Sequence, residues 1–485
     1  SASSFPSSGT VIINQEIISY TGVSGNTLTG LTRGALGTTA AIHSSGDEVR
    51  DSSGYAGWNT AVSGDVVTAP GLWSLDNFGN KLIATITGGE SFEWDSNPTA
   101  ANNTRATIIS GAPTASEFSL VSTPDRHLIF FGTETTIGDP TTQDPMFIRF
   151  SSQEDINTYT PSSINTAGTQ RLADGSKIVG AIRGRDAIYV WTNTALFIMR
   201  FVGPPFTFSF QQVGTNCGLI GPNAAVEVNG TAYWMSDNGF FRYTGKLESL
   251  PCLVEDHVYD DINTIPKQHV NVGLNNLFGE IMWFYPNSGS GTVNRMVAYN
   301  YLDSSNERPV WTTGTLARTA WEDSAVFGKP HATEYNPDAT TSATDANHVV
   351  GCTDGTSTYF EHETGLNQIK EGAITAIAAS IESGDFDIGQ QGLQGDGEFM
   401  MKIRRVIPDF LAQTGDARIT LNLRDFPNDT SASSTLGPFT VTSGTQKIDT
   451  RARARSISLK IDNTSTSQFW KLGTFRIDYQ PDGRR

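Results

Sequence analysis

The sequence has little cysteine and no long apolar run, and each scarcity excludes a class of protein. Its three cysteines, Cys217, Cys252 and Cys352, are far apart and odd in number, which argues against a disulfide framework and favours synthesis in a reducing compartment. No stretch approaches the ~20 apolar residues that cross a bilayer, so we predict no transmembrane helix and no membrane insertion. The first residues show no charged segment followed by an apolar core, so we expect no signal peptide.

Basic charge is also scarce, and it is unevenly placed. The 485 residues include 33 Lys and Arg against 50 Asp and Glu, a formal net charge of −17. Because phosphates are met by Lys and Arg, this balance argues against a protein that binds nucleic acid over its whole surface. Residues 400–485 nevertheless hold 14 basic and 8 acidic residues, which leaves a net charge of −23 on residues 1–399. The chain is an acidic body followed by a basic C-terminal region.

Catalytic and metal-binding motifs are missing as well. The sequence contains no G-x-S-x-G, no H-E-x-x-H and no P-loop, and its 7 histidines lack metal-ligand spacing. His362 lies between Glu361 and Glu363, but neighbours in a strand point to opposite faces, so the three cannot share one site. The acidic stretch 383–399 does not place its carboxylates at EF-hand positions and is better interpreted as a turn. We expect no catalytic residue, no metal site and no cofactor.

What the sequence does contain is glycine and a recurring strand pattern. Its 48 glycines and its Thr-, Val- and Ile-rich segments suit an all-β protein with many tight turns. Between about residues 70 and 370, an apolar strand, a polar turn and an aromatic-rich strand recur at intervals of 44 to 67 residues. The repeats are anchored on Ile83, Ile129, Ile188, Ala232, Met282 and Val349. This spacing favours a β-propeller of about six blade-like repeats over the alternative, a large sandwich of hairpins.

The sequence divides into three regions. Residues 1–50 are predicted to form a small N-terminal β module, residues 51–372 the β-propeller body, and residues 373–485 a C-terminal β platform. Within the platform, apolar and polar residues alternate across 419–423, which is the period of a half-buried strand.

The segment 449–463, DTRARARSISLKIDN, gathers basic side chains in one strand-like stretch. At a period of two, its three arginines fall on the same face as the apolar residues that follow them, unless a bulge intervenes. Such a face suits a seam where guanidinium groups pair with carboxylates of another element or subunit. Phosphate binding, the alternative, would need aromatic stacking platforms or more basic neighbours. The interface candidates are Arg404, Arg405, Arg451, Arg453 and Arg455.

Several segments resemble the tail nozzle, or tail stabilisation, proteins of short-tailed bacteriophages. They are WFYPNSGSGTVNRMVAYNYLDSSNERPVWTTGTLARTAW (283–321), YFEHETGLN (359–367), RRVIPDF (404–410) and FWKLGTFRIDYQPDGRR (469–485). The similarity covers about residues 170–485 and is densest in the last hundred. The 9–49 segment resembles a small β module found in virion tail proteins.

This resemblance implies a structural virion protein rather than an enzyme. The implied partners are further copies in a ring, six by the resemblance, together with the portal adaptor (head-to-tail connector) and tail fibres or spikes. Double-stranded DNA would pass non-specifically through the ring's acidic lumen, whose charge repels phosphates. The implied location is the virion tail, after assembly in the cytoplasm of the host bacterium. The alternative from another class is a carbohydrate-binding or glycan-cleaving propeller used for host attachment.

Overall fold

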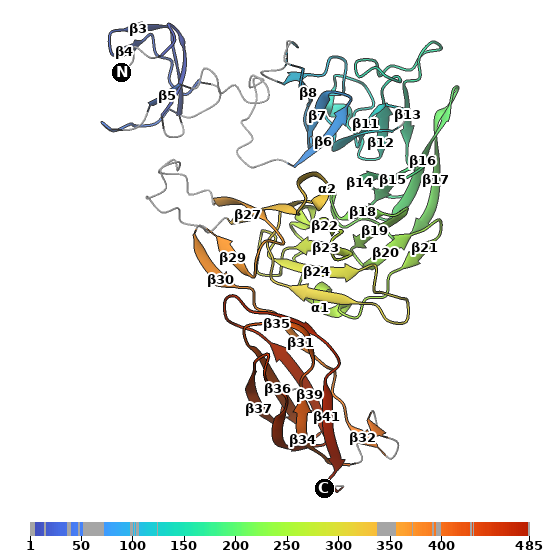
Figure 1. The fold of residues 1–485 in the computed structure, drawn as a ribbon. Coiled ribbons are helices and arrows are strands. Elements are labelled where there is room, and N and C mark those ends of the chain that lie inside the picture. The colour runs from blue at the N-terminus through green and yellow to red at the C-terminus, as the bar shows by residue number, and fades with distance from the viewer. Residues whose placement is uncertain are drawn as a thin grey trace. The chain divides into compact units, whose positions relative to one another are not determined.

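The computed structural model divides the chain into two units, residues 1–362 and 363–485. It describes residues 5–13, 16–35, 40–46, 49–51, 72–97, 100, 102, 106–123, 125–336, 356–370, 372–389, 392–393, 399–426, 429 and 431–483. Over these residues the structure is almost entirely β (Figure 1), and its α-helices are α1 (Glu255–Asp261) and α2 (Ser324–Phe327). No helix in the described part of the chain is long and apolar enough to cross a membrane.

The N-terminal strands form a small β module. Its strands are β1 (Gly9–Ile13), β2 (Glu16–Tyr20), β3 (Gly22–Ser24), β4 (Thr27–Thr29) and β5 (Val49–Asp51). β1 pairs with β2 and β5, and β3 pairs with β4. The carboxylate of the buried Glu16 accepts a hydrogen bond from Arg33 Nε (2.5 Å) and others from the Gly34 and Ala41 N–H groups. The bond from Arg33 is the main reason why the pKa of Glu16 lies well below its usual range.

Six antiparallel sheets follow one another along the described part of residues 72–361. In each sheet the strands pair in sequence order, so that each sheet is a single meander. The strands are β6 (Trp73–Phe78), β7 (Lys81–Ile86), β8 (Ser91–Asp95), β9 (Thr107–Ile108); β10 (Phe118–Val121), β11 (Leu128–Phe131), β12 (Phe147–Phe150), β13 (Gly168–Arg171); β14 (Ile178–Arg183), β15 (Ile188–Thr192), β16 (Ala195–Gly203), β17 (Thr207–Thr215); β18 (Ala225–Val228), β19 (Thr231–Ser236), β20 (Gly239–Tyr243), β21 (Leu247–Ser249); β22 (Asn271–Asn275), β23 (Glu280–Tyr285), β24 (Arg295–Asn300), β25 (Trp311–Gly314); and β26 (Ala320–Glu322), β27 (His331–Asn336), β28 (Thr356–Glu361).

The first strands of successive sheets pack side by side. β6 lies against β10, β10 against β14, β14 against β18, β18 against β22, and β22 against β26. Four-stranded meanders that pack in this way are the blades of a β-propeller. The predicted all-β propeller with about six blade-like repeats is therefore confirmed.

The predicted repeat anchors occupy equivalent positions in the blades. Ile83, Ile129, Ile188, Ala232 and Met282 lie in the second strands β7, β11, β15, β19 and β23. The sixth anchor, Val349, lies outside the described residues, and the second strand of the sixth sheet is β27.

Buried tryptophans join neighbouring blades. Trp234 of β19 donates from Nε1 to the Cys217 carbonyl (2.9 Å), and Trp283 of β23 donates to the Ala224 carbonyl (3.0 Å). Both indoles are fully buried in one core that runs through the third, fourth and fifth sheets. A buried indole contributes a large apolar area, and its N–H is satisfied here by a carbonyl of a blade connection.

The direction of the strands gives the propeller two distinct faces. Turns between first and second strands and between third and fourth strands lie on one face, here called the hairpin face, which includes residues 184–187, 204–206 and 276–279. Turns between second and third strands and the links between blades lie on the other, here called the connection face, which includes residues 193–194 and 216–224. Antiparallel pairing requires this separation because successive strands run in opposite directions.

The second unit contains two main sheets with a shared core. The sheets are ordered β31-β39-β36-β37 and β38-β34-β41, and three strand pairs accompany them. The strands are β29 (Asn367–Lys370), β30 (Ala373–Ala376), β31 (Ser380–Glu382), β32 (Ile388–Gly389), β33 (Gly392–Leu393), β34 (Met401–Ile407), β35 (Phe410–Thr414), β36 (Ala417–Arg424), β37 (Ser434–Val441), β38 (Ile448–Ala454), β39 (Ser456–Asp462), β40 (Phe469–Leu472) and β41 (Arg476–Pro481). Ile419, Leu421 and Leu423 of β36 all enter the core, so the predicted alternation is confirmed.

Candidate interaction surfaces

The arginine strand has a different register from the predicted one. β38 ends at Ala454, β39 belongs to the other sheet, and Arg455 lies at the junction, where its Nε donates to the Asp425 carbonyl (3.1 Å). The alanines of β38 are buried in the same core as the apolar residues of β39, whereas Arg451 and Arg453 are exposed. The prediction that these arginines share a face with the apolar residues after them is therefore wrong. The change of sheet restarts the alternation, so the arginines point away from the core.

The outward face of the β38-β34-β41 sheet is strongly basic, and four of the five predicted arginines lie on it. Residues around Arg404 form a bulge, because the pairing of β34 shifts register between Ile403 and Arg405 on both sides. The bulge places both arginines on the outward face, while Ile403 is buried. The charged residues of this basic face are Lys402, Arg404, Arg405, Lys447, Arg451, Arg453, Arg476, Asp449, Asp478 and Asp482.

Some of these basic groups are matched within the face. Arg405 Nε lies 2.9 Å from Asp449, and Arg453 Nε lies 2.7 Å from Asp482. Lys447 has the largest effect in lowering the pKa of the Asp449 carboxyl, and Arg405 has the next largest. Exposed pairs of this kind contribute little to stability because water and salt screen them. They fix the direction of the guanidinium groups rather than hold the fold together.

Arg404 and Arg451 differ from Arg405 and Arg453, which have carboxylate partners. Both are exposed, and neither forms an ion pair or side-chain hydrogen bond with any residue in the described part of the chain. Ile403 is opposite Ala452 and Arg405 is opposite Asp449, so Arg404 lies across from Thr450 and Arg451 of β38. Two adjacent guanidinium groups repel each other, and a carboxylate from outside the chain would relieve that repulsion.

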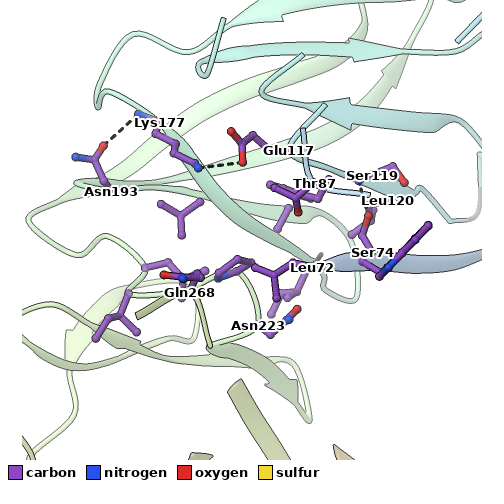
Figure 2. Close-up of a pocket in the computed structure, with 18 of the residues that line it drawn as sticks. Leu72, Ser74, Thr87, Glu117, Ser119, Leu120, Lys177, Asn193, Asn223 and Gln268 are labelled. Carbon is purple, nitrogen blue, oxygen red and sulfur yellow. Dashed lines mark hydrogen bonds and ion pairs between the residues drawn. The ribbon is translucent and has the colours of Figure 1, made fainter. Parts of the chain in front are cut away.

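A second surface feature is a cavity of about 730 Å³ on the connection face of the propeller (Figure 2). Its walls come from the first strands of the first three blades and from the links that follow the third and fourth blades. Apolar side chains, among them Trp73 and Leu75 of β6, alternate with polar ones. Figure 2 shows Asn193, Asn223 and Gln268 among the side chains of its wall.

Most charged side chains of this cavity bind one another. Lys177 Nζ lies 2.9 Å from Glu117 (Figure 2), and Arg183 Nη1 lies 2.8 Å from Asp76. Asp76 also accepts the Val121 N–H at 2.7 Å, so it joins the first three blades. These carboxylates and cations therefore hold strands together at the mouth of the cavity.

The histidine that invited a catalytic interpretation has a structural role. His362 accepts a hydrogen bond from Arg318 Nε (2.9 Å), whereas Glu361 pairs with Lys329 (3.2 Å). Asp385 of the acidic stretch pairs with an arginine of β36, and residues 394–398 of that stretch lie outside the described part. No group of three His, Cys, Asp or Glu side chains among the described residues is placed to hold a metal ion.

A buried Thr–His–Asp cluster escaped detection in the sequence. His127 Nδ1 lies 2.8 Å from Asp125, and its Nε2 lies 3.1 Å from Thr166 Oγ1. The arrangement resembles a catalytic triad, but His127 is fully buried and Thr166 Oγ1 also accepts the Gln153 N–H (2.7 Å). With no exposed histidine atom, the cluster ties two loops of the second sheet together. Asp125 and His127 come from the loop between β10 and β11, and Thr166 comes from the loop between β12 and β13. Thr166 lies 39 residues after His127, so no short sequence motif marks the cluster.

Comparisons with known proteins add little. No family model and no curated protein matches the sequence. Solved structures that resemble it include dihydro-heme d1 dehydrogenase NirN in complex with DHE, at 9% identity and a TM-score of 0.34, over 68% of this chain and 58% of that one. BamB from Moraxella catarrhalis follows at 11% identity and 0.30, over 60% and 83%, and apo AztD from Citrobacter koseri at 10% and 0.29, over 64% and 86%.

The chain thus spans less than two thirds of the length of NirN. Likeness at these identities and TM-scores carries no inference about function. The propeller assignment depends on the order and packing of the sheets described above.

Proposed function

We propose that the protein is a non-enzymatic, ring-forming tail nozzle of a short-tailed bacteriophage, through which the genome leaves the virion. The observation that carries the proposal is the basic face of the second unit, which lies in the part of the chain where the sequence resemblance is densest. A propeller body followed by a separate β unit is also the architecture that the resemblance implies.

The basic face is suited to an acidic protein partner. Arg404 and Arg451 present neighbouring guanidinium groups without a carboxylate among the described residues, and residues 1–399 carry a net charge of −23. A carboxylate of a neighbouring subunit or of the adaptor can pair with such planar groups in a bidentate way. The same acidic body would keep DNA from adhering to the lumen wall, because like charges repel.

Nucleic acid is a poorer match for this face. Three aspartates, Asp449, Asp478 and Asp482, interrupt its basic groups. In the described strands β34, β38 and β41, no aromatic side chain points outward beside these charged residues. Nucleic-acid bases would therefore find no stacking platform on this face.

The test is the mass of the purified protein in solution, by light scattering or native mass spectrometry, alone and with the adaptor protein of the same virion. We expect a closed ring in at least one condition. Arg404→Glu and Arg451→Glu should each weaken assembly on the adaptor about 10- to 100-fold, because reversing a charge at an interface costs ~1.4–3 kcal/mol. Lys471→Glu, an equal charge change on the exposed strand β40, should have no such effect. A monomer in both conditions contradicts the proposal.

The cavity of the propeller supports a second candidate, a glycan-binding protein for host attachment. An exposed tryptophan, Trp73, beside amides such as Asn193, Asn223 and Gln268 provides a stacking surface and neutral hydrogen-bonding groups. Titration with fragments of host polysaccharide, followed by tryptophan fluorescence, would show saturable binding that Trp73→Ala abolishes. The absence of a saturable signal removes this candidate.

A further inference from the structure

The exposed apolar side chains of the propeller are concentrated on its hairpin face. The turns and strand ends of that face carry Ile164, Phe201, Val202, Phe206, Leu277, Phe278, Leu302, Val310 and Phe327. In the described links and strand ends of the connection face, the corresponding residues are Trp73, Ile108, Leu253 and Ile265. Scattered exposed apolar residues are normal, but a bias toward one face indicates a surface that another molecule covers.

The most prominent element of this face is the hairpin of β16 and β17. Pairing between β15 and β16 ends where Ile188 meets Met199, whereas β16 and β17 continue to pair up to Gly203 and Thr207. Residues 200–209, here called the finger, therefore extend about 13 Å beyond the sheet at ~3.3 Å per residue. Its tip is apolar, and the Phe206 side chain is 77% exposed.

Buried groups fix the finger from near its base to its outer end. The Phe201 ring centroid lies 5.7 Å from that of His127, and Phe208 is buried 5.1 Å from the same histidine. Thr207 is buried in the left-handed region at φ +61°, and its Oγ1 donates to the Thr166 carbonyl (2.9 Å). The Thr–His–Asp cluster thus anchors the finger on the second sheet. An anchored finger loses little conformational freedom when it binds.

The fifth blade carries a compact apolar patch on the same face, made by Leu277, Phe278 and Leu302. The two turns that hold it are joined, since the Tyr301 N–H donates to the Gly279 carbonyl (2.8 Å). Leu302 is 66% exposed although it lies directly over Gly279, where a Cβ would overlap it.

We propose that the finger of one subunit docks on the apolar patch of the next subunit. This inference rests on the proposed ring and names the contact that would build it. The charges of the two surfaces are also complementary. Arg200 at the base of the finger is exposed and has no ion pair among the described residues. Asp303 and Glu307 are exposed beside the patch. Two different surfaces that meet head to tail generate a ring when the rotation closes.

Two variants test the contact under the conditions in which the wild-type protein assembles. Phe206→Glu places a charge at the apolar tip of the finger, and Leu302→Glu places a charge in the apolar patch. Each substitution should weaken self-association at least 100-fold. Ile265→Glu, on a side chain that is 87% exposed on the connection face, is the matched control and should assemble normally. Circular dichroism and the thermal midpoint show whether each variant is folded.

The decisive measurement mixes the two variants. A Leu302→Glu chain keeps its finger and a Phe206→Glu chain keeps its patch, so an equimolar mixture should form a one-to-one dimer although each variant alone is monomeric. Arg200→Glu should weaken the ring, and Glu307→Lys in the same chain should restore it. Variants that assemble like the wild type, or a mixture without dimers, overturn the inference and leave the proposed ring intact. A wild-type protein that never assembles overturns both.

Discussion

Arg318 links the fifth and sixth sheets, and we expect Arg318→Ala to lower the free energy of unfolding by about 3–5 kcal/mol. Its side chain is 4% exposed, and its Nη1 lies 3.0 Å from Glu334 and its Nε 2.9 Å from His362. The guanidinium carbon lies 4.1 Å from the Phe360 ring centroid, and the Arg318 carbonyl accepts from Asn271 Nδ2 (2.9 Å). Truncation removes the cation from Glu334, a carboxylate that is only 12% exposed, and the stability loss follows mainly from that.

The same cluster predicts a specific pH dependence. Burial, then the charges of Arg318 and His331, lower the pKa of His362 to about 4. The unfolded chain takes up this proton near pH ~6.5, so the unfolding free energy should fall as the pH falls from about 7 to 4. Solvent screening reduces the effect to roughly 2 kcal/mol.

Urea denaturation followed by tryptophan fluorescence, at pH 7.0 and 4.5, measures both effects. Other carboxyl groups titrate in this range, so the pH term of His362 is the difference between the wild type and His362→Gln. In Arg318→Ala that term should shrink, because the Arg318 charge no longer adds to the effect of burial in lowering the pKa of His362. A loss below about 1 kcal/mol for Arg318→Ala, or equal pH dependence in wild type and His362→Gln, would refute the reasoning.

Two further predictions concern the propeller body. Gly218→Ala should destabilise it by about 1–3 kcal/mol, because the added Cβ would overlap a backbone carbonyl, whereas Gly291→Ala has open space around it; denaturation midpoints compare the two. Burial raises the pKa of the Cys217 thiol to about 11 and that of Cys252 to about 12. In a Cys352→Ser background, a thiol reagent at pH 8 should therefore label neither cysteine until urea unfolds the protein, and rapid native labelling would contradict this.

The repeat pattern of the propeller could be predicted from the sequence because the second strands of the blades are buried on both sides. β15 and β23, for example, are apolar along almost their whole length, and each is followed by a polar turn and another apolar strand. Such runs at a blade-like interval need no knowledge of contacts between distant residues. The alternation of β36 was readable for the same local reason.

The prediction for the arginine strand failed because its geometry depends on segments elsewhere in the chain. The face of Arg451 depends on where β38 ends and β39 joins another sheet, and the position of Arg404 depends on a bulge against both β38 and β41. Period-two alternation holds only within one uninterrupted strand. The His127 cluster was missed for a related reason, since its Thr166 lies 39 residues from His127 in the sequence.

The two proposed contacts can be separated by experiment because they lie in different units. The finger and the patch belong to residues 1–362, whereas Arg404 and Arg451 belong to residues 363–485. If the finger builds the ring and the basic face binds the adaptor, Phe206→Glu should abolish self-association, while Arg404→Glu should leave the ring intact and weaken only its attachment. If Arg404→Glu instead disrupts the ring itself, the basic face pairs with the acidic body of a neighbouring subunit. The charge asymmetry between the two parts of the chain would then serve ring formation directly.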